Sequence, residues 1–235
     1  SFSNLNLEKQ NKKLDLKNFT KIISDNEINK EIIFDKKKNY VVANFFWEEI
    51  LHKNFSNIKN LKKKGITVFS NYLFSNIKSG VKIKKVGFFE KFKPNKNNGG
   101  ILIAVGSAKS RLLNKFKIRI LKLLKKNFLK KKKIYLDPKL YISDLKKFNI
   151  HKADFSEKMY SNISFAIIKP GLGTVEECLK RGIIMFPIME KENKEFEHNA
   201  QVLIKKKLGF RFEKFEKTLK FINLKFYDNK FKNLF

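Results

Sequence analysis

Several residue types that often define a class of protein are scarce in this chain of 235 residues. Its single cysteine, Cys178, excludes an internal disulfide and fits a reducing compartment. No apolar run approaches the ~18–20 residues that a membrane-spanning helix needs. No N-terminal stretch has the charged and then apolar pattern of a signal peptide. We therefore expect a cytoplasmic protein.

Acidic residues and arginine are also scarce. Lysine and arginine total 53 against 22 acidic residues, which gives a net charge of +31, yet only four of the basic residues are arginine. Nucleic-acid sites favour the planar arginine fork, so this charge is weak support for a nucleic-acid binder. We interpret the lysines as a solvated surface, and contact with a polyanion or a membrane surface stays open as the alternative.

Apolar residues, in contrast, are plentiful. They make up 42% of the chain and include 25 phenylalanines, so a sizeable core can form. Short apolar runs alternate with helical patterns, which predicts an α/β fold with parallel strands. We expect strands at residues 21–25, 39–46, 66–70, 81–89, 101–105, 133–136, 165–168 and 183–187.

A break in composition divides the chain. Residues 91–100 (KFKPNKNNGG) combine Pro, Asn and Gly with almost no apolar residue, which is typical of a linker. We predict a first domain at residues 1–92, a linker at 93–100 and a second domain at 101–235. Because the chain begins with a polar stretch and its first strand comes late, we expect the first domain to be incomplete.

Two helices are expected in the second half. Residues 112–129 form an amphipathic and strongly basic pattern, and residues 196–208 form another helical pattern that Gly209 would stop. A basic amphipathic helix can lie on anionic lipid at the inner face of a membrane. The same pattern also suits a helix that packs on a sheet with its lysines in solvent, and both interpretations stay open.

The segment after the strand at residues 165–168 carries the clearest chemical signal. Lys169 and Pro170 lead into a turn with Gly171 and Gly173, and Thr174 is expected to open a helix. A helix that starts after a glycine turn presents free N–H groups and its positive dipole end, which suits a phosphate. The alternative is structural, because the residues from Thr174 onward also spell a capping box, T-x-x-E, closed by Glu177.

The longer pattern resembles the C-terminal donor-binding domain of GT-B glycosyltransferases. It is most similar to the peptidoglycan N-acetylglucosaminyltransferase branch and to predicted transferases with a KPGYGT-x-x-E signature. The resemblance covers residues 99–212. Its matching positions, in order, are Gly171, Thr174, Glu177, Gly182, Pro187, Glu195, Asn199 and Ala200.

The resemblance implies a role for each matching position. Glu177 would bind the ribose hydroxyls, and Glu195 would reach the donor sugar, although Phe196 replaces the glutamine usual next to it. That replacement leaves the identity of the sugar open. The residues implied to hold the donor diphosphate are Gly106, Ser107, Lys169, Gly171, Gly173 and Thr174, and those implied to frame the base are Phe155 and Met159.

The first half shows a weaker resemblance to the acceptor domain of the same transferases. Residues 44–47 (NFFW) are similar to an N-F-x-W segment of that domain, and the strand at residues 21–25 ends in Asp25. Asp25 is the single candidate for a general base. The fold implied is of the GT-B type, with two Rossmann-like domains facing a cleft and the N-terminal one incomplete.

The implied reaction is displacement at the anomeric carbon of a nucleotide-diphospho-sugar, with UDP as the usual nucleotide. No metal or cofactor is implied, because no D-x-D carboxylate pair lies near the turn. The acceptor would be a glycan, a lipid-linked molecule or a small molecule. A nucleotide-sugar hydrolase, a 2-epimerase and a non-catalytic donor-binding subunit that needs a partner chain remain as alternatives.

Overall fold

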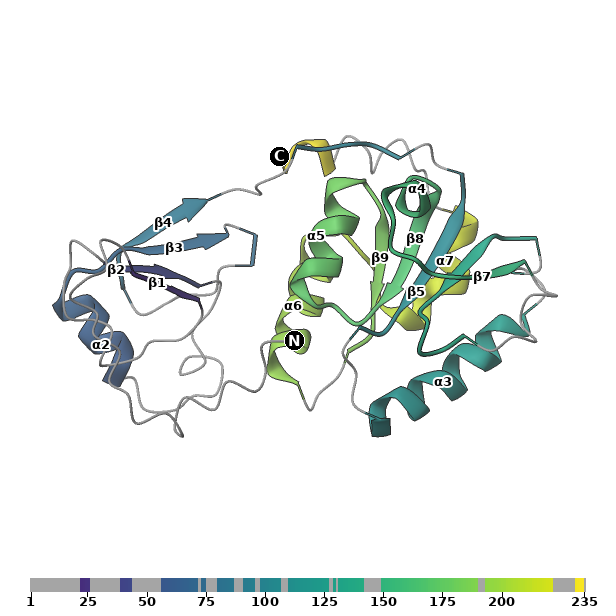
Figure 1. The fold of residues 1–235 in the computed structure, drawn as a ribbon, viewed down its shortest axis with the longest axis horizontal. Helices are drawn as coiled ribbons and strands as arrows, with labels where there is room; N and C mark the ends of the chain where they lie inside the picture. Colours follow the sequence, from purple (N-terminus) through teal and green to yellow (C-terminus); the bar gives the residue numbers. More distant parts are fainter. Residues whose placement is uncertain are drawn as a thin grey trace. The chain divides into compact units, whose positions relative to one another are not determined.

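The chain forms two compact units, Ser1–Val86 and Gly87–Phe235. A computed structural model describes residues 22–25, 39–43, 56–71, 73–74, 80–86, 91–95, 98–106, 110–126, 129, 131–141, 149–189, 193–221 and 231–234. Both units are α/β structures with parallel sheets (Figure 1).

The first unit contains a four-stranded parallel sheet in the order β1-β2-β3-β4. Parallel neighbours cannot be joined by tight hairpins and need crossover connections, which agrees with the wide spacing of these strands in the sequence. One described helix, α2, lies between β2 and β3 in the chain. The elements are β1 (Ile22–Asp25), β2 (Asn39–Val42), α2 (Ser56–Lys63), β3 (Val68–Asn71) and β4 (Ile83–Val86).

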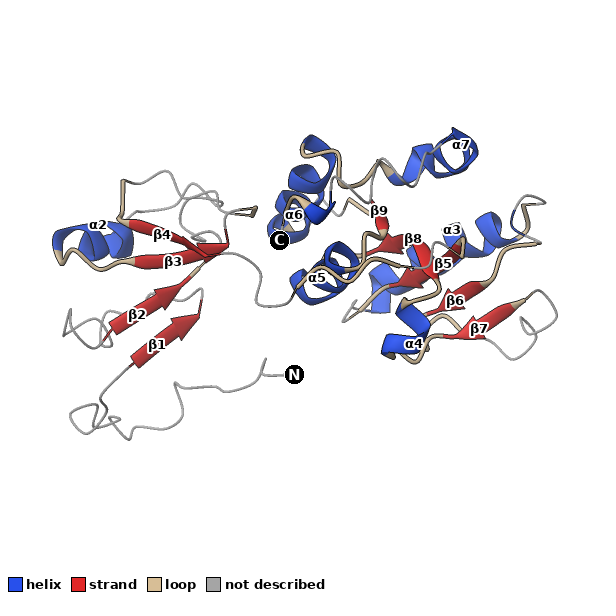
Figure 2. Ribbon diagram, turned by 90° about the horizontal axis from the view of Figure 1, so that it is seen from above, coloured by secondary structure: helices blue, strands red, loops and turns tan. Residues whose placement is uncertain are grey.

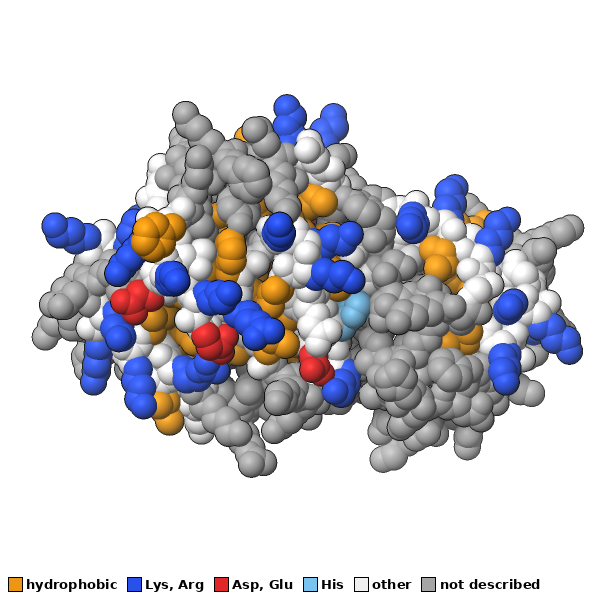
Figure 3. All heavy atoms as spheres, turned by 180° about the vertical axis from the view of Figure 1, so that it is seen from behind, with side chains coloured by type: hydrophobic (Ala, Val, Ile, Leu, Met, Phe, Trp, Pro, Cys, Tyr) orange, Lys and Arg blue, Asp and Glu red, His pale blue; other side chains and the backbone are white. Residues whose placement is uncertain are grey.

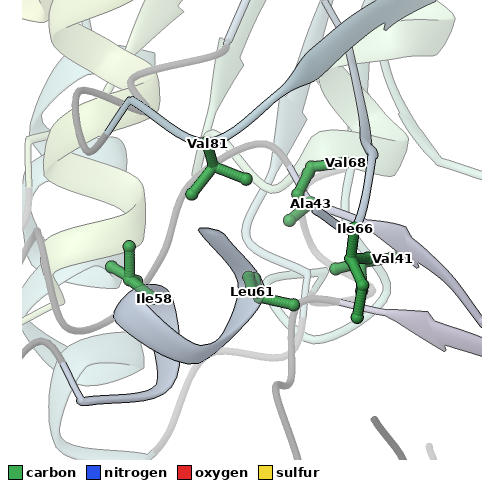
Figure 4. Packing of buried hydrophobic residues seen from close by; sticks show 7 residues of the cluster. All are labelled: Val41, Ala43, Ile58, Leu61, Ile66, Val68 and Val81. Carbon is green, nitrogen blue, oxygen red and sulfur yellow. The ribbon is translucent and has the colours of Figure 1, made fainter. Parts of the chain in front are cut away.

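A small apolar cluster holds α2 against this sheet. Ile58 and Leu61 stand three residues apart and therefore share one face of the helix. Figure 4 shows them beside side chains that come from the strands and from the segments leading into the strands. The members of the cluster, each at most 6% exposed, are Val41, Ala43, Ile58, Leu61, Ile66, Val68 and Val81.

The second unit contains a five-stranded parallel sheet in the order β7-β6-β5-β8-β9. Its helices are arranged around the sheet (Figure 2). The strands are β5 (Gly100–Ala104), β6 (Ile134–Leu136), β7 (Ile150–Lys152), β8 (Ile163–Ile168) and β9 (Ile184–Pro187). The helices are α3 (Ser110–Leu124), α4 (Glu157–Tyr160), α5 (Leu172–Lys180), α6 (Lys194–Lys205) and α7 (Phe215–Phe221), preceded by the 3₁₀ turn Phe212–Lys214.

The strand order makes the second unit Rossmann-like. The chain starts at β5 in the centre, moves outward through β6 and β7, and then returns to build β8 and β9 on the other side. In such sheets ligands bind beyond the carboxyl ends of the strands where the order reverses, here between β5 and β8. Every residue of β5 and β8 is buried, as expected for the central strands of a parallel sheet covered on both faces.

The sequence predicted most of these strands. All eight predicted strands are present, with ends that shift by one to several residues, whereas β7 was missed because its residues, Ile-His-Lys, form no apolar run. The predicted stop of a helix at Gly209 is wrong. Helix α6 ends at Lys205, Lys207 adopts a left-handed conformation with φ of 56°, and Gly209 instead forms a bridge with Met185.

The basic residues are spread over the surface. On the face shown in Figure 3, lysine and arginine side chains lie scattered over the described parts of both units. Helix α3 buries Phe116 and Ile120, while Ile118 is 57% exposed among basic neighbours. Within the described residues, no helix has the length and apolar character to cross a membrane.

The close approach of Gly209 to β9 predicts a stability effect. A Cβ at Gly209 would clash with the backbone carbonyl of Met185, which cannot move without disturbing the sheet. We expect Gly209→Ala to lower the free energy of unfolding by about 1–3 kcal/mol, measured by urea unfolding. Gly173→Ala is the control, because a Cβ at this helical position meets no atom within 4 Å. Equal stability of the two variants would contradict the prediction.

Candidate functional site

The glycine turn leads directly into helix α5 at the carboxyl edge of the sheet. The N–H of Lys169 donates to the carbonyl of Ala104 at 3.1 Å, so this turn starts beside the end of β5. Gly171 is the N-cap of α5 and makes no side-chain cap. The N–H groups of the first helical residues, from Leu172 to Thr174, therefore have no partner further back in the helix. They form an anion-attracting helix end.

The capping box expected at the start of this helix is not formed. Helix α5 begins at Leu172, so Thr174 is its third residue and not its opening residue. Glu177 is turned away from the helix start and pairs with Lys180 at 2.9 Å and with Arg181 at 3.5 Å. The interpretation of Thr174 and Glu177 as a capping box is thus wrong, and Glu177 instead pairs with the two cations at the end of the helix.

Residues of helix α6 contact the turn at residues 169–171. The Nδ2 of Asn199, which is fully buried, donates to the carbonyl of Pro170 at 3.0 Å. The Nζ of Lys169 stands 4.2 Å from the ring centroid of Phe196, and a Cβ at Gly171 would touch the same ring. These contacts hold the turn in one conformation.

Glu195 lies in the first turn of α6, close to the same turn. Its partial burial raises the pKa of the carboxyl, and the positive charge of Lys169, together with His198, opposes that rise. The structure thus brings Glu195, Lys169 and Gly171 to one place, at the N-terminal ends of α5 and α6.

A second turn follows β5 and is organised by an aspartate. The N–H groups of Val105 and Gly106 donate to Oδ2 of Asp137 at 3.0 and 3.2 Å. Gly106 has a φ of 54°, and its carbonyl accepts from Nζ of Lys139 at 2.6 Å. The N–H of Gly106 is therefore engaged by a carboxylate and is not available to an anionic ligand. Ser107 lies outside the described residues.

Asp137 was missed in the sequence. It is 4% exposed and follows β6 directly, and its other oxygen, Oδ1, accepts from the N–H of Lys139 at 3.0 Å. The available signal was an acidic residue placed immediately after a buried strand. That signal alone could not show which backbone groups the carboxylate would bind, because they lie 31 and 32 residues away.

A cavity of about 660 Å³ runs beside α5. Four of the residues singled out in the sequence lie in its wall, namely Phe155, Gly173, Thr174 and Glu177. Met159, expected to frame the base, is instead 4% exposed and does not line the cavity, whereas the neighbouring Tyr160 does. The complete lining is Lys93, Phe155, Glu157, Tyr160, Gly173, Thr174, Glu177, Lys180 and Arg181.

Phe155 is held at the cavity wall by a tight turn. The N–H of Ser156 donates to Oδ1 of Asp154 at 3.0 Å, and Oγ of Ser156 caps α4 by accepting from the N–H of Met159. Phe155 has a φ of 55° and is 41% exposed, and its ring centroid lies 6.5 Å from that of Tyr160. Left-handed backbone at a bulky residue costs about 1–3 kcal/mol, and such strain clusters at ligand sites.

The charges around the cavity favour an anion. Three cations, from Lys93, Lys180 and Arg181, face two carboxylates, from Glu157 and Glu177, which leaves an excess of one positive charge. Cys178 belongs to α5 and is fully buried, and this burial raises the pKa of its thiol, so it is not placed to act as a nucleophile. In the described part of the chain, no group of three or more His, Cys, Asp or Glu side chains is placed to hold a metal ion.

Two of the remaining expectations concern the first unit. Asp25 ends β1, but its side chain is not among those described. The segment at residues 44–47 lies outside the described residues.

The segment predicted as a linker is bonded to the second unit, because Lys93 and Asn95 donate their N–H groups to the carbonyls of Lys180 and Arg181.

Comparison with known proteins identifies the fold. No protein-family profile matches the chain, and no curated protein matches it by sequence. A crystal structure described as that of the glycotransferase of kitacinnamycin is similar, with a TM-score of 0.50 and 8% sequence identity over 83% of this chain. The chain spans 65% of the length of that structure. The chain thus has a glycosyltransferase-like α/β fold.

The role of Asp137 in shaping the β5 turn can be tested. In Asp137→Asn the side chain keeps one acceptor oxygen in place of two and loses its charge, so a buried N–H is left without its charged partner. We expect the free energy of unfolding to fall by about 1.5–3 kcal/mol in urea unfolding. Glu216→Gln, which changes an exposed carboxylate on α7, should leave it unchanged. A stability loss no greater than that of this control would exclude the role.

The raised pKa of Glu195 predicts a dependence of stability on pH. Below the ordinary pKa of 4.5, Glu195 is protonated in both the folded and the unfolded chain, so Glu195→Gln should match the wild type. As the pH rises from there to neutrality, the wild type has to ionise a partly buried carboxyl. We therefore expect Glu195→Gln to become the more stable protein at pH 7, measured by urea unfolding across this range. A difference that does not change with pH would contradict this.

Proposed function

We propose that the chain is a glycosyltransferase whose second unit binds a nucleotide-diphospho-sugar, with UDP as the nucleotide. The Rossmann-like sheet and the glycosyltransferase-like fold support this class. Because a shared fold does not establish a function, the proposal depends on the site.

The order of groups along α5 is the observation that carries the proposal. The cavity is bounded by the helix start at Gly173 and Thr174, then by the carboxylate of Glu177, and then by the aromatic pair Phe155 and Tyr160. This order suits a diphosphate, a ribose and a base. From Gly173 to Arg181 the helix rises ~12 Å, which is comparable to the length of an extended nucleoside diphosphate.

The diphosphate would be held by the free N–H groups of α5 and by Lys169. When the bond to the anomeric carbon breaks, negative charge builds up on the leaving diphosphate. The helix dipole of α5 and the Lys169 ammonium, which stands beside the helix start over the Phe196 ring, would stabilise this charge. Gly171 lets the backbone approach the phosphates, and the neighbouring turn of Gly106 and Ser107 would border them from the end of β5.

Glu177 would accept hydrogen bonds from the two ribose hydroxyls, since an ionised carboxylate is a pure acceptor. Its side chain is 33% exposed, so it can reach a ligand in the cavity. Phe155 would stack on the base, with Tyr160 in the place expected for Met159. Glu195 would contact the sugar, because it lies at the same helix ends as Lys169 and Gly171.

The first unit would supply the acceptor side of a GT-B enzyme. The acceptor-binding domain would then be the unit Ser1–Val86 and the donor-binding domain the unit Gly87–Phe235, in place of the bounds 1–92 and 101–235 with a linker at 93–100 that the sequence predicted. Asp25 stands at the carboxyl end of β1 and would act as the general base for an acceptor hydroxyl on a glycan, a lipid-linked molecule or a small molecule.

Calorimetric titration with UDP, GDP and dTDP tests the donor site. We expect one of them to bind, and Glu177→Ala to weaken that binding about tenfold or more, because it removes hydrogen bonds to a charged group. Glu213→Ala is the matched control, since that carboxylate makes an exposed ion pair with Arg119 elsewhere on the unit. An unchanged affinity in Glu177→Ala would remove the ribose assignment.

A further inference from the structure

Two buried cations stand at the C-terminal end of α5. Lys180 is 5% exposed and Arg181 is 6% exposed, which is unusual for charged side chains unless they are paired. Both pair with Glu177, and each contacts a different oxygen of its carboxylate. The Nζ of Lys180 is 2.9 Å from Oε1, and Nε of Arg181 is 3.5 Å from Oε2.

The guanidinium of Arg181 bridges both carboxylates of the cavity. Its Nη2 is 3.6 Å from Oε1 of Glu157, and its Cζ lies 5.4 Å from the ring centroid of Tyr160. Its Nε is buried and has no hydrogen-bond partner in the described part of the chain. A buried donor without a hydrogen bond is costly, and this nitrogen has instead the longer ion-pair contact with Oε2 of Glu177 at 3.5 Å.

The backbone of these two residues is hydrogen-bonded to the segment at residues 91–95. The N–H groups of Lys93 and Asn95 donate to the carbonyls of Lys180 and Arg181 at 2.8 and 3.2 Å. These carbonyls lie at the C-terminal end of α5, where no N–H group of the helix is left to donate to them. These bonds tie the backbone of both cations to the segment at residues 91–95.

We infer that Arg181, together with Lys180, is a positioning residue that fixes the carboxylate of Glu177 for a vicinal diol. An ionised carboxylate has about four lone-pair sites, and each of the two cations engages one oxygen of Glu177. The sites that remain match the two hydroxyls of a ribose. The site would then select ribonucleoside diphosphates over their 2′-deoxy counterparts. This inference rests on the proposed function and narrows its donor to a ribonucleotide.

The variant Arg181→Lys tests whether the positive charge alone is enough, or whether the contact with both carboxylates is needed. Arginine presents Nε and a terminal nitrogen in one rigid plane, so it can contact Glu177 and Glu157 together. Lysine keeps the positive charge but has a single ammonium, which cannot hold both carboxylates. A loss of selectivity in Arg181→Lys would thus report the geometry of the bridge.

The test is calorimetric titration of the whole chain with UDP and with 2′-deoxy-UDP, repeated with GDP and 2′-deoxy-GDP. The wild type should prefer the ribonucleotide about tenfold or more, as expected for a hydrogen bond to a charged group. In Arg181→Lys this ratio should fall to about threefold or less through a loss of ribonucleotide affinity. Arg119→Lys is the matched control, because Arg119 also pairs with a carboxylate, Glu213, and covers an aromatic ring, Phe212.

Each outcome decides the inference. Equal weakening of both nucleotides in Arg181→Lys, or an unchanged ratio, would show a merely structural role and overturn it. If thermal unfolding shows that Arg181→Lys does not fold, Lys180→Met carries the same test, since it removes the cation on Oε1. If the preference for the ribonucleotide is lost in Glu177→Ala but kept in Arg181→Lys, this inference is overturned and the proposed function stands. A wild type that binds none of the nucleotides overturns it together with the proposed function.

Discussion

The pairing of β5 with β8 at the centre of the second sheet is the constraint on which the candidate site depends. Both strands are wholly buried, and the chain leaves their adjacent carboxyl ends in opposite directions. The bond from the Lys169 N–H to the Ala104 carbonyl extends this pairing by one step into the loops. Because both turns start from the same rigid edge, the helix start of α5 and the turn at Gly106 face one region of space.

The turns at this edge take their shape from side chains that arrive from distant parts of the chain. Asp137 engages the N–H groups of the β5 turn, Asn199 holds the turn before α5, and the backbone of residues 91–95 closes the far end of that helix. Irregular backbone at a sheet edge has few partners of its own, so buried polar side chains complete its hydrogen bonding. In this way hydrogen bonds from distant residues fix the turns on either side of the β5 and β8 ends.

The charges that line the cavity nearly cancel, although the chain as a whole is strongly basic. The net charge of +31 is spread over the chain, whereas the cavity balances three cations against two carboxylates. Burial strengthens these few interactions, because Arg181 and Lys180 are withdrawn from solvent that would screen them. The excess of one positive charge suits an anionic ligand, and in the proposed function Glu177 would accept hydrogen bonds from that ligand.

The sequence by itself determined the eight strands it predicted and the glycine turn, because apolar runs and turn residues act locally. It also indicated Phe155 and Glu177 as site residues, through resemblance to a family. Tertiary structure alone decided where α5 begins, that Gly209 touches β9, that Asp137 binds the turn after β5, and that Arg181 reaches Glu157. These features arise from contacts between residues far apart in the chain or from the competition between a local cap and distant partners. No periodicity in the sequence encodes such contacts, so they appear only once the chain is folded.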